Sequence, residues 1–479
     1  MEYIIWCLLG TVYGAVIGII PIAGATTGLL TVYAFSDYFV SNPYLGVVFM
    51  TSLIASSSTG DSFTSILTGI PGSNTTAASV LDGYPMAKNG QAGRAIGIAI
   101  MDSTINGVLW GVIAFAFLPF YSKLILSFGV PEFTAFILLS LCCVGLITCK
   151  NHLLSVVSIV IGITLGLIGL DPRNGAPRMT FGWEYLNDGI QLMPIIAGLF
   201  AAPELIEGWK NRHYKVAKIE NYWQQLFQGF RDCFIHWRDM LRSGLIGFIT
   251  GLLPGVGGSI GDLLAYGITV SRNPKETFGN GNPKGVMGCE GANNAQKASS
   301  MLPTILFGIP AAPFAAVMMA VCSTMGMYFG TPALVSDTNF MWAIGVSFVA
   351  SSILVAIISM FTTNLIVKIL QVPFWIYAVV ISAVVTWGCM EYTGGIEDVY
   401  ILLICCAIGI LAKYTGLSRP AIMLSFIVAA KLENYGQQTF TMYSIEQLVQ
   451  RPMVVILVLL SVFLVGWSLI RKNKGLNYN

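Results

Sequence analysis

Apolar runs close to the length of a membrane span recur along the whole chain, and this feature most restricts its fold. The runs include Phe133–Cys149, Leu153–Leu170, Val399–Leu411 and Met453–Ile470. A helix needs roughly 20 predominantly apolar residues to cross a bilayer. Only 10% of the 479 residues are charged, against roughly 25% in soluble domains. The sequence therefore predicts an all-α polytopic membrane protein; it does not show the short alternating segments typical of a membrane β-barrel.

One segment, Pro203–Arg242, is polar, aromatic and basic. Its basic residues are Lys210, Arg212, Lys215, Lys218, Arg231, Arg238 and Arg242. Because cytoplasmic loops are enriched in lysine and arginine, this segment is expected to be cytoplasmic. Met1–Tyr3 has neither residue type and is expected to lie outside. The basic segment also divides the chain into two halves of similar length.

The two halves share motifs in the same order. The first pair is "GIIPIAGATTGLL" (Gly18–Leu30) and "GLLPGVGGSIGDLL" (Gly251–Leu264). The second pair is "SILTGIPGSNTTAA" (Ser65–Ala78) and "TILFGIPAAPFAA" (Thr304–Ala316). Two ordered matches at a nearly constant offset indicate a two-fold internal repeat.

Counting apolar passes gives an odd number before Pro203, so the second half is expected to start inside and to be inverted. The same count places Arg272–Lys284 outside and Leu81–Ala95 inside. One additional C-terminal span returns the basic tail to the cytoplasm. The predicted division is 1–203 for the first repeat and 204–242 for a cytoplasmic connecting loop. Residues 243–450 form the second, inverted repeat, and 451–479 form the extra span and tail.

Prolines interrupt the matched segments at membrane depth. Proline removes a backbone donor and breaks a helix, yet "FGIPAAPFAAVMM" (Phe307–Met319) carries Pro310 and Pro313 in an otherwise apolar run. Non-helical backbone is tolerated there only where it is buried in protein or lines a water-filled cavity. Paired interruptions in two halves indicate the binding site of a secondary transporter. We expect the breaks at Pro71 and Pro310 to face one cavity.

The residues near these breaks are small or neutral and polar, which suits an anion held by helix ends and a hard cation held by oxygen atoms. The predicted substrate-binding residues are Pro71, Gly72, Ser73, Asn74, Thr75, Pro254, Gly255, Gly257, Gly258, Ser259, Pro310 and Ala311. The predicted cation-binding residues are Asn293, Asn294, Glu290 and Asp61. Asp102 and Asp262 are further acids within spans, where a functional or paired role is expected. The alternative is that the small residues only allow close helix packing.

Several motifs together resemble the large membrane subunit of the tripartite tricarboxylate transporters, the TctA-like family. They are "PGSNTTAASVLDGYPMAKNGQAGRAIGIA", "LPGVGG", "EGANNA" followed by "LPTILFGIP", and "RMTFGWEYLNDGIQLMPIIAGLFAAPE". The resemblance runs from about Gly10 to Pro452. It implies a translocating subunit in a bacterial cytoplasmic (inner) membrane that imports a tricarboxylate- or dicarboxylate-type substrate. The driving force would be a Na⁺ or H⁺ gradient, with no cofactor and no metal centre.

The resemblance also implies two partners, a small membrane subunit and a periplasmic solute-binding protein that delivers the carboxylate. Its prolyl-glycyl segments, found here at Pro71–Gly72 and Pro254–Gly255, are the expected substrate region. This chain departs from the pattern at Ile22, where glycine is usual, and at Ala311–Ala312, where Gly-Ser is usual. These departures leave the identity of the carboxylate open.

Other classes of function stay open on the sequence. One is another inverted-repeat secondary transporter, and another is an anion channel that works without a binding protein. Saturable, gradient-driven uptake would separate a carrier from a channel. An intramembrane enzyme would need a nucleophile–base pair or metal ligands at helical spacing, and the sequence shows neither pattern. No basic run suits a nucleic acid.

Overall fold

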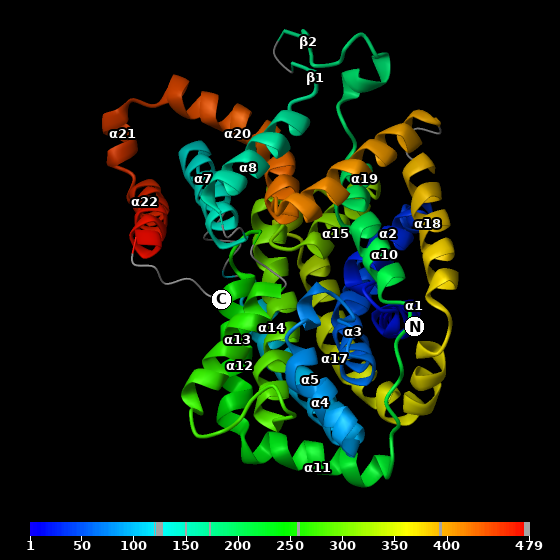
Figure 1. Ribbon diagram of the computed structural model, residues 1–479. Coiled ribbons are helices and arrows are strands. Elements are labelled where there is room, and N and C mark those ends of the chain that lie inside the picture. Colours follow the sequence, from blue (N-terminus) through cyan, green and yellow to red (C-terminus); the bar gives the residue numbers. More distant parts are fainter. Residues whose placement is uncertain are drawn as a thin grey trace.

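The structure is a computed structural model, and it describes residues 1–118, 120, 128–148, 151–171, 174–255, 259–391 and 395–473. Helices make up nearly all of it (Figure 1). In these ranges five helical segments are long and apolar enough to cross a membrane: Glu2–Ile19, Ser79–Ala116, Leu192–Lys210, Thr338–Leu370 and Glu397–Thr415. The described strands, β1 (Gly169–Leu170) and β2 (Pro177–Arg178), form one short antiparallel pair. The prediction of an all-α polytopic membrane protein is confirmed.

The helices follow one another in a similar order in the two halves. The first half contains α1 (Glu2–Ile19), α2 (Gly24–Tyr33), α3 (Pro43–Thr68), η2 (Asn74–Thr76), α4 (Ser79–Met86), α5 (Ala92–Ala116), α7 (Val130–Thr148), α8 (His152–Gly166), α9 (Leu192–Ile196), η5 (Ala197–Ala201) and α10 (Ala202–Lys210). After α11 (Tyr222–Ile235), the second half contains α12 (Trp237–Gly251), α13 (Ser259–Arg272), α14 (Pro283–Phe307), α15 (Pro313–Thr324), α16 (Pro332–Val335), α17 (Thr338–Leu370), α18 (Phe374–Glu391), α19 (Glu397–Thr415) and α20 (Arg419–Met442). The chain continues through α21 (Ile445–Val449) to α22 (Pro452–Asn473).

Helices of the two halves pack in exchanged pairs: where a helix of the first half packs on a helix of the second half, their counterparts in the other halves also pack on each other. α3 packs against α17, and its counterpart α14 packs against α5. α2 packs against α15, and α13 packs against η2. α8 packs against α20, and α19 packs against α9 and η5. Two repeats with the same helix order that are related by a two-fold axis produce this exchange, and their inverted orientation stays a prediction. The exact boundaries of the repeats stay a prediction.

The first two helices of each half form a hairpin that turns back inside the protein. α2 returns beside α1, where the hydroxyl groups of Tyr13 and Thr31 share a hydrogen bond, and α13 returns beside α12. The turns contain Ile22, with φ of 70°, and Gly255, with φ of 74°. Glycine adopts a positive φ without steric cost, whereas a β-branched residue there is strained. Ile22, one of the two departures from the family pattern, is therefore a strained residue at a turn.

The helices that follow, α3 and α14, end in the same way. Their C-caps, Gly69 and Gly308, have φ of 73° and 62°, and a left-handed glycine commonly ends a helix. Beyond each cap a hydroxyl group accepts a hydrogen bond from the interrupted backbone. The N–H of Gly72 donates to Ser65 Oγ at 3.0 Å, and the N–H of Ala311 donates to Thr304 Oγ1 at 3.3 Å. The backbone N–H groups at these breaks therefore find hydrogen-bond partners within the protein and are not left unpaired in lipid.

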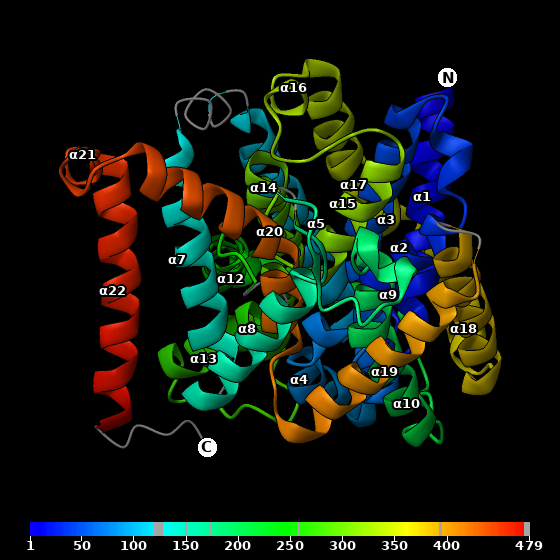
Figure 2. The same cartoon turned by 90° about the horizontal axis from the view of Figure 1, so that it is seen from above.

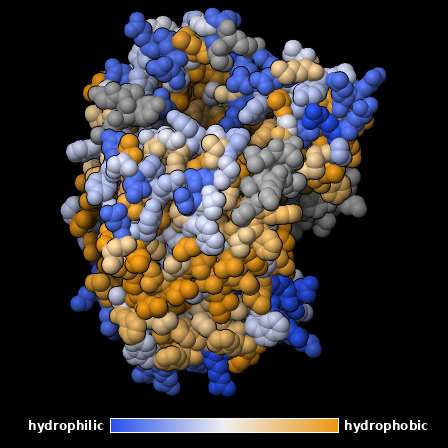
Figure 3. Space-filling view, turned by 180° about the vertical axis from the view of Figure 1, so that it is seen from behind, coloured by the Kyte–Doolittle hydropathy of each residue, from blue (hydrophilic) through white to orange (hydrophobic). Residues whose placement is uncertain are grey.

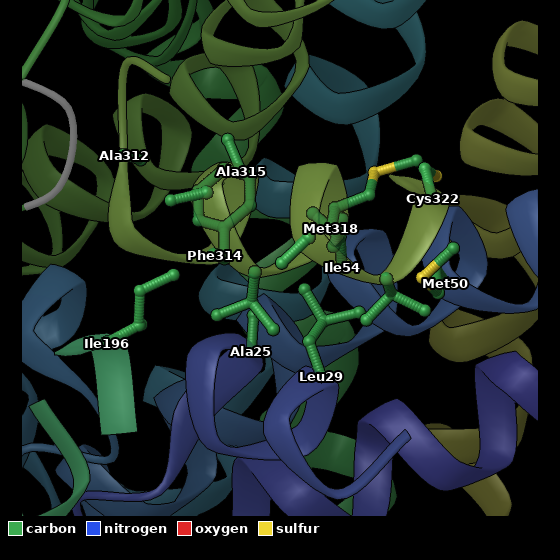
Figure 4. Close-up of a cluster of buried hydrophobic side chains, with 14 of the residues drawn as sticks. Ala25, Leu29, Met50, Ile54, Ile196, Ala312, Phe314, Ala315, Met318 and Cys322 are labelled. Atoms are coloured by element: carbon green, nitrogen blue, oxygen red, sulfur yellow. The ribbon is translucent and has the colours of Figure 1, made fainter. Parts of the chain in front are cut away.

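The largest hydrophobic core lies where the interrupted segments of the two halves meet. Figure 4 shows Ala25 and Leu29 of α2 facing Phe314 and Met318 of α15, with Ile54 of α3 beside them. All of these side chains are buried. Apolar packing thus holds a half-helix of the first repeat against a half-helix of the second repeat.

α3 connects two opposite faces of the bundle. Near its start, Tyr44 lines a second cavity together with Tyr3. Near its end, the carbonyl of Leu67 accepts a 2.8 Å hydrogen bond from Ala217 in the connecting loop. In Figure 2, accordingly, the N-terminus lies at the upper end of the bundle and α10 reaches the lower end. The N-terminus and the basic connecting loop therefore lie on opposite sides.

The placement of Arg272–Lys284 on the outside is wrong. Asp82 of α4 accepts hydrogen bonds of 2.8–2.9 Å from the N–H groups of Gly279, Gly281 and Asn282. Asn89 donates to the carbonyl of Asn280 at 3.2 Å. This loop therefore shares a face with the turn after α4, and that turn contacts α11 through a 2.8 Å bond from Gln225 to Gly90.

The physical reason for this correction is the break between α12 and α13. The pass count treated that part of the chain as a complete crossing, whereas the hairpin returns to the side from which it entered. The basic residues of Arg272–Lys284 therefore join those of the connecting loop on one face, which agrees better with a cytoplasmic location than the predicted outer one.

The exterior is largely apolar. Figure 3 shows hydrophobic side chains gathered over much of the lower half of one face, with hydrophilic side chains above them. Exposed residues on α17 include Trp342, Ile357 and Phe361. At the periphery α22 packs on α7 (Figure 2), where Arg451 forms an ion pair with Glu132 at 2.9 Å. An apolar exterior of this kind suits a protein surrounded by lipid.

We predict that single cysteines at Lys218 and Lys275 react with a membrane-impermeant maleimide from the same side of the membrane, and a cysteine at Tyr3 from the other side. Labelling of right-side-out and inverted vesicles measures this directly. The described native cysteines are buried or partly buried, so the unsubstituted protein is the control. Labelling of positions 3 and 275 from one side would contradict the re-entrant hairpin.

Candidate functional site

A cavity of about 260 Å³ lies where the interrupted segments of both halves meet. The first half contributes Ile22, Ala23, Gly24, Ala25, Thr26, Asp61, Ser73, Thr75, Thr148, Phe200 and Glu204. The second half contributes Gly255, Ile260, Lys297, Ala312, Pro313, Phe314, Leu417, Ser418, Arg419 and Pro420. The two breaks in each half therefore border a single cavity.

Several helices begin at the cavity wall. α2 begins at Gly24, α15 begins at Pro313, and α20 begins at Arg419. Neither α2 nor α15 has a side-chain cap, whereas Ser418 caps α20. The first N–H groups of a helix lack partners within the helix, and the N-terminus carries a partial positive charge. Helix ends from both halves can therefore attract an anion into the cavity.

Two cationic side chains line the same cavity. Lys297 of α14 is almost fully buried; its Nζ donates to Ser57 Oγ at 2.9 Å and lies 3.8 Å from Asp61 Oδ2. The guanidinium of Arg419 donates to the carbonyl of Leu199 at 3.3 Å and lies 5.5 Å from the centre of the Phe200 ring. A guanidinium has five N–H donors in a planar fork that matches a carboxylate. Together with the helix ends, these groups can bind a small anion.

Asp61 connects the cavity wall to the break of the first half. Its Oδ2 accepts a 2.6 Å hydrogen bond from Ser73 Oγ. Gly72 packs against the backbone of the same residue, since a Cβ at Gly72 would lie 2.4 Å from the Asp61 carbonyl oxygen. The close approach that requires glycine at position 72 is therefore an approach to α3 and not to a ligand.

The predicted substrate-binding residues separate into those that line the cavity and those that support it. Ser73, Thr75 and Gly255 line it. Pro71, Gly72, Pro254, Pro310 and Ala311 do not line it and form the turns that shape its wall. Gly257 and Gly258 lie outside the described residues, as do the side chains of Asn74 and Ser259. Ligand binding by any of these residues stays a prediction.

Of the predicted cation-binding residues, one lines the cavity and the others lie behind its wall. Asp61 lines the cavity, whereas Glu290, Asn293 and Asn294 are buried along α14 behind it. Glu290 Oε2 accepts a 2.5 Å hydrogen bond from Ser62 Oγ. Asn294 Nδ2 donates to the carbonyl of Ser103 on α5 at 3.1 Å. Asn294 therefore faces a different helix from Glu290, although the two residues were grouped on the sequence.

Lys297 and Arg419 line the cavity but are not among the site residues predicted from the sequence. Lys297 had a detectable signal, because a lysine within a buried helix is costly and so is expected to have a function. The sequence gives a weaker indication of a function for Arg419. This residue begins α20 three residues after the left-handed Gly416, and only the tertiary fold brings it beside the breaks.

Comparisons with known proteins agree with this arrangement. Residues 4–424 match the model of the "Tripartite tricarboxylate transporter TctA family". The chain is 28% identical over 437 residues to an Agrobacterium vitis protein named "Uncharacterized 52.8 kDa protein in TAR-I ttuC' 3'region", covering 90% of this chain and 86% of that protein. It is 29% identical over 191 residues to an "Uncharacterized protein in TAR-II ttuC' 3'region" of Agrobacterium vitis, covering 40% of this chain and 78% of the relative. No solved structure matches.

We predict that Gly72→Ala destabilises the protein by about 1–3 kcal/mol, because overpacking against α3 forces the backbone to shift. Gly267→Ala is the matched control: a Cβ at this position of α13 meets no atom within 4 Å, and alanine favours a helix by about 0.5–1 kcal/mol relative to glycine. The stability of both variants is compared through their thermal unfolding midpoints in detergent. Equal midpoints for the two variants would show that Gly72 does not pack as described.

Proposed function

Because the chain belongs to the tripartite tricarboxylate transporter TctA family, we propose that it is the translocating subunit of a secondary transporter that imports a carboxylate. In this proposal the subunit lies in the bacterial inner membrane and works with a small membrane subunit and a periplasmic solute-binding protein. A cation gradient drives the import. The proposed role is transport and not catalysis.

The observation that carries the proposal is the cavity that both interrupted halves share. Lys297, Arg419 and the N-terminal ends of α2 and α15 border it. These groups favour an anion, and Arg419 suits a planar carboxylate in particular. The volume of about 260 Å³ lies below the roughly 300–1,000 Å³ of pockets for drug-sized ligands. The proposed substrate is therefore a small carboxylate.

Two acidic residues, Asp61 and Glu204, also line the cavity wall. Asp61 lies 3.8 Å from Lys297, so part of its charge is compensated within the wall. Glu204 of α10 has an interaction of its own within the structure. Arg419 approaches the cavity from α20 with no carboxylate within ion-pair distance in the described residues, and it is the proposed first contact of the substrate.

The exchanged packing of the two halves supports alternating access. Each half supplies two breaks and one set of half-helices to the cavity, so movement of one half against the other would expose the cavity to either side. The binding protein would dock on the face that carries Tyr3 and Tyr44, because Arg272–Lys284 lies on the opposite face. A channel is the alternative, and saturable uptake would exclude it.

We predict that Arg419→Gln reduces uptake roughly 10- to 100-fold at low substrate concentration, because a hydrogen bond to a charged group contributes about 1.5–3 kcal/mol. Uptake is measured in proteoliposomes that contain both membrane subunits, a cation gradient and the loaded binding protein. The substrate is the carboxylate that co-purifies with that binding protein.

Arg212→Gln, in the connecting loop, is the matched control. Its guanidinium stacks over the Trp209 ring at 4.7 Å, and neither residue lines the cavity. Uptake by Arg419→Gln at the rate of this control would contradict the assignment of the cavity as the carboxylate site.

A further inference from the structure

Lys297 lies between the cavity and a group of buried carboxylates. Its Nζ borders the cavity and is held by Ser57 Oγ at 2.9 Å, with Asp61 Oδ2 at 3.8 Å. Asp262 of α13 and Glu290 of α14 are also within electrostatic reach of this ammonium. The relative exposures of the three carboxylate residues are 0%, 1% and 0% for Asp61, Asp262 and Glu290.

With all three carboxylic groups ionised, this group would carry more negative than positive charge. One ammonium faces three carboxylates, and all of them are removed from water. A buried charge is strongly unfavourable unless it is paired. The ionised group therefore needs additional positive charge, from protons or from a metal cation, to be stable within the membrane.

Oxygen atoms without partners mark the place for this charge. In the described part of the chain, both carboxylate oxygens of Asp262, Oε1 of Glu290 and Oδ1 of Asn293 have no hydrogen-bond partner. Glu290, Asn293 and Lys297 are spaced so that they share one face of α14. α13 packs along α14, with Gly261 beside Gln296. Asp262 therefore approaches this face from the neighbouring helix.

The chemistry of these atoms favours a metal cation over a proton. Carboxylate and amide oxygens are the ligands of hard cations, which take several oxygen ligands at once. A proton would be held by one oxygen and shared with one acceptor, and would leave the remaining oxygens without partners. Ser58 Oγ and Thr59 Oγ1 of α3 are further buried oxygens without partners in the described residues.

We propose that Asp262, Glu290 and Asn293 bind a Na⁺ ion, and that this ion competes with Lys297 for the carboxylates and so frees the lysine for the cavity. The site differs from the sequence prediction in including Asp262 and excluding Asn294. The ion site is argued from the contacts of these residues alone. The binding of a carboxylate substrate to Lys297 rests on the proposed function.

The proposed exchange gives a physical link between ion and substrate. Without the ion, the carboxylates attract Lys297, which is held beside Asp61 and Ser57. With Na⁺ present, this attraction weakens, and the ammonium can bind a carboxylate in the cavity that it already borders. By linkage, a substrate that binds Lys297 would strengthen Na⁺ binding by the same factor.

The ion site can be tested without any carboxylate. The purified protein in detergent is titrated with NaCl against choline chloride at constant ionic strength, and the thermal unfolding midpoint is followed by tryptophan fluorescence. We expect a saturable rise for the wild type, because a ligand that binds only the folded state stabilises it. The Na⁺ assignment would be overturned if NaCl did not raise the unfolding midpoint. It would also be overturned if KCl or choline chloride raised the midpoint as much as NaCl does.

Variants separate the proposed ligands from their neighbours. Asp262→Asn and Asn293→Ala are expected to raise the half-saturating Na⁺ concentration at least 10-fold. Asn294→Ala is the matched control, since the amide nitrogen of Asn294 donates to the carbonyl of Ser103 on α5, and this variant should stay within about twofold of the wild type. The proposed site would be overturned if Asp262→Asn had the same half-saturating Na⁺ concentration as the wild type. It would also be overturned if Asn293→Ala and Asn294→Ala changed this concentration equally.

Lys297→Met tests the competition. Removing the internal ammonium should lower the half-saturating Na⁺ concentration at least fivefold, whereas a lysine with only a packing role would leave it unchanged or raise it. An unchanged or raised value overturns the proposed exchange. A protein that passes these tests but transports no carboxylate would support the ion site and contradict the proposed function, so the two failures are distinguishable.

Discussion

The structure depends on one constraint: a membrane protein that interrupts its helices must satisfy the exposed backbone groups within itself. Both halves meet this constraint in the same way. Left-handed Gly69 and Gly308 end α3 and α14. Hydroxyl groups of the same helices, Ser65 and Thr304, then accept hydrogen bonds from the interrupted backbone at 3.0 and 3.3 Å. The breaks are therefore fixed elements of the fold, and the half-helices after them begin at defined positions.

The candidate site follows from this geometry. Since helices of the two halves pack in exchanged pairs, half-helices from both converge on one cavity instead of forming two separate pockets. Apolar packing of α2 on α15 holds them together (Figure 4). Positive charge comes from α2 and α15 as helix ends, and from Lys297 and Arg419 as side chains. The buried carboxylates next to Lys297 are the cost of this arrangement, and the proposed cation offsets it.

Much of this was predictable from the sequence, because it depends on local patterns. Apolar runs predict the spans, and the matched Pro/Gly segments predict the breaks. The pass count failed at Arg272–Lys284, because run length does not show whether a chain crosses the membrane or turns back after a break. The roles of Gly72 and Asn294 were also not predictable, since each depends on a tertiary neighbour, Asp61 and Ser103. Arg419 joins the site only when α20 is packed in place.

Breaks from both halves border one cavity, which is the proposed site of the carboxylate. The most direct measurement is a cryo-electron microscopy map of the reconstituted membrane complex, with the carboxylate delivered by the binding protein. We expect ligand density between the start of α2 and the start of α15, in contact with Arg419 and Lys297. Ligand density elsewhere in the membrane region, with this cavity closed by side chains, would contradict the account.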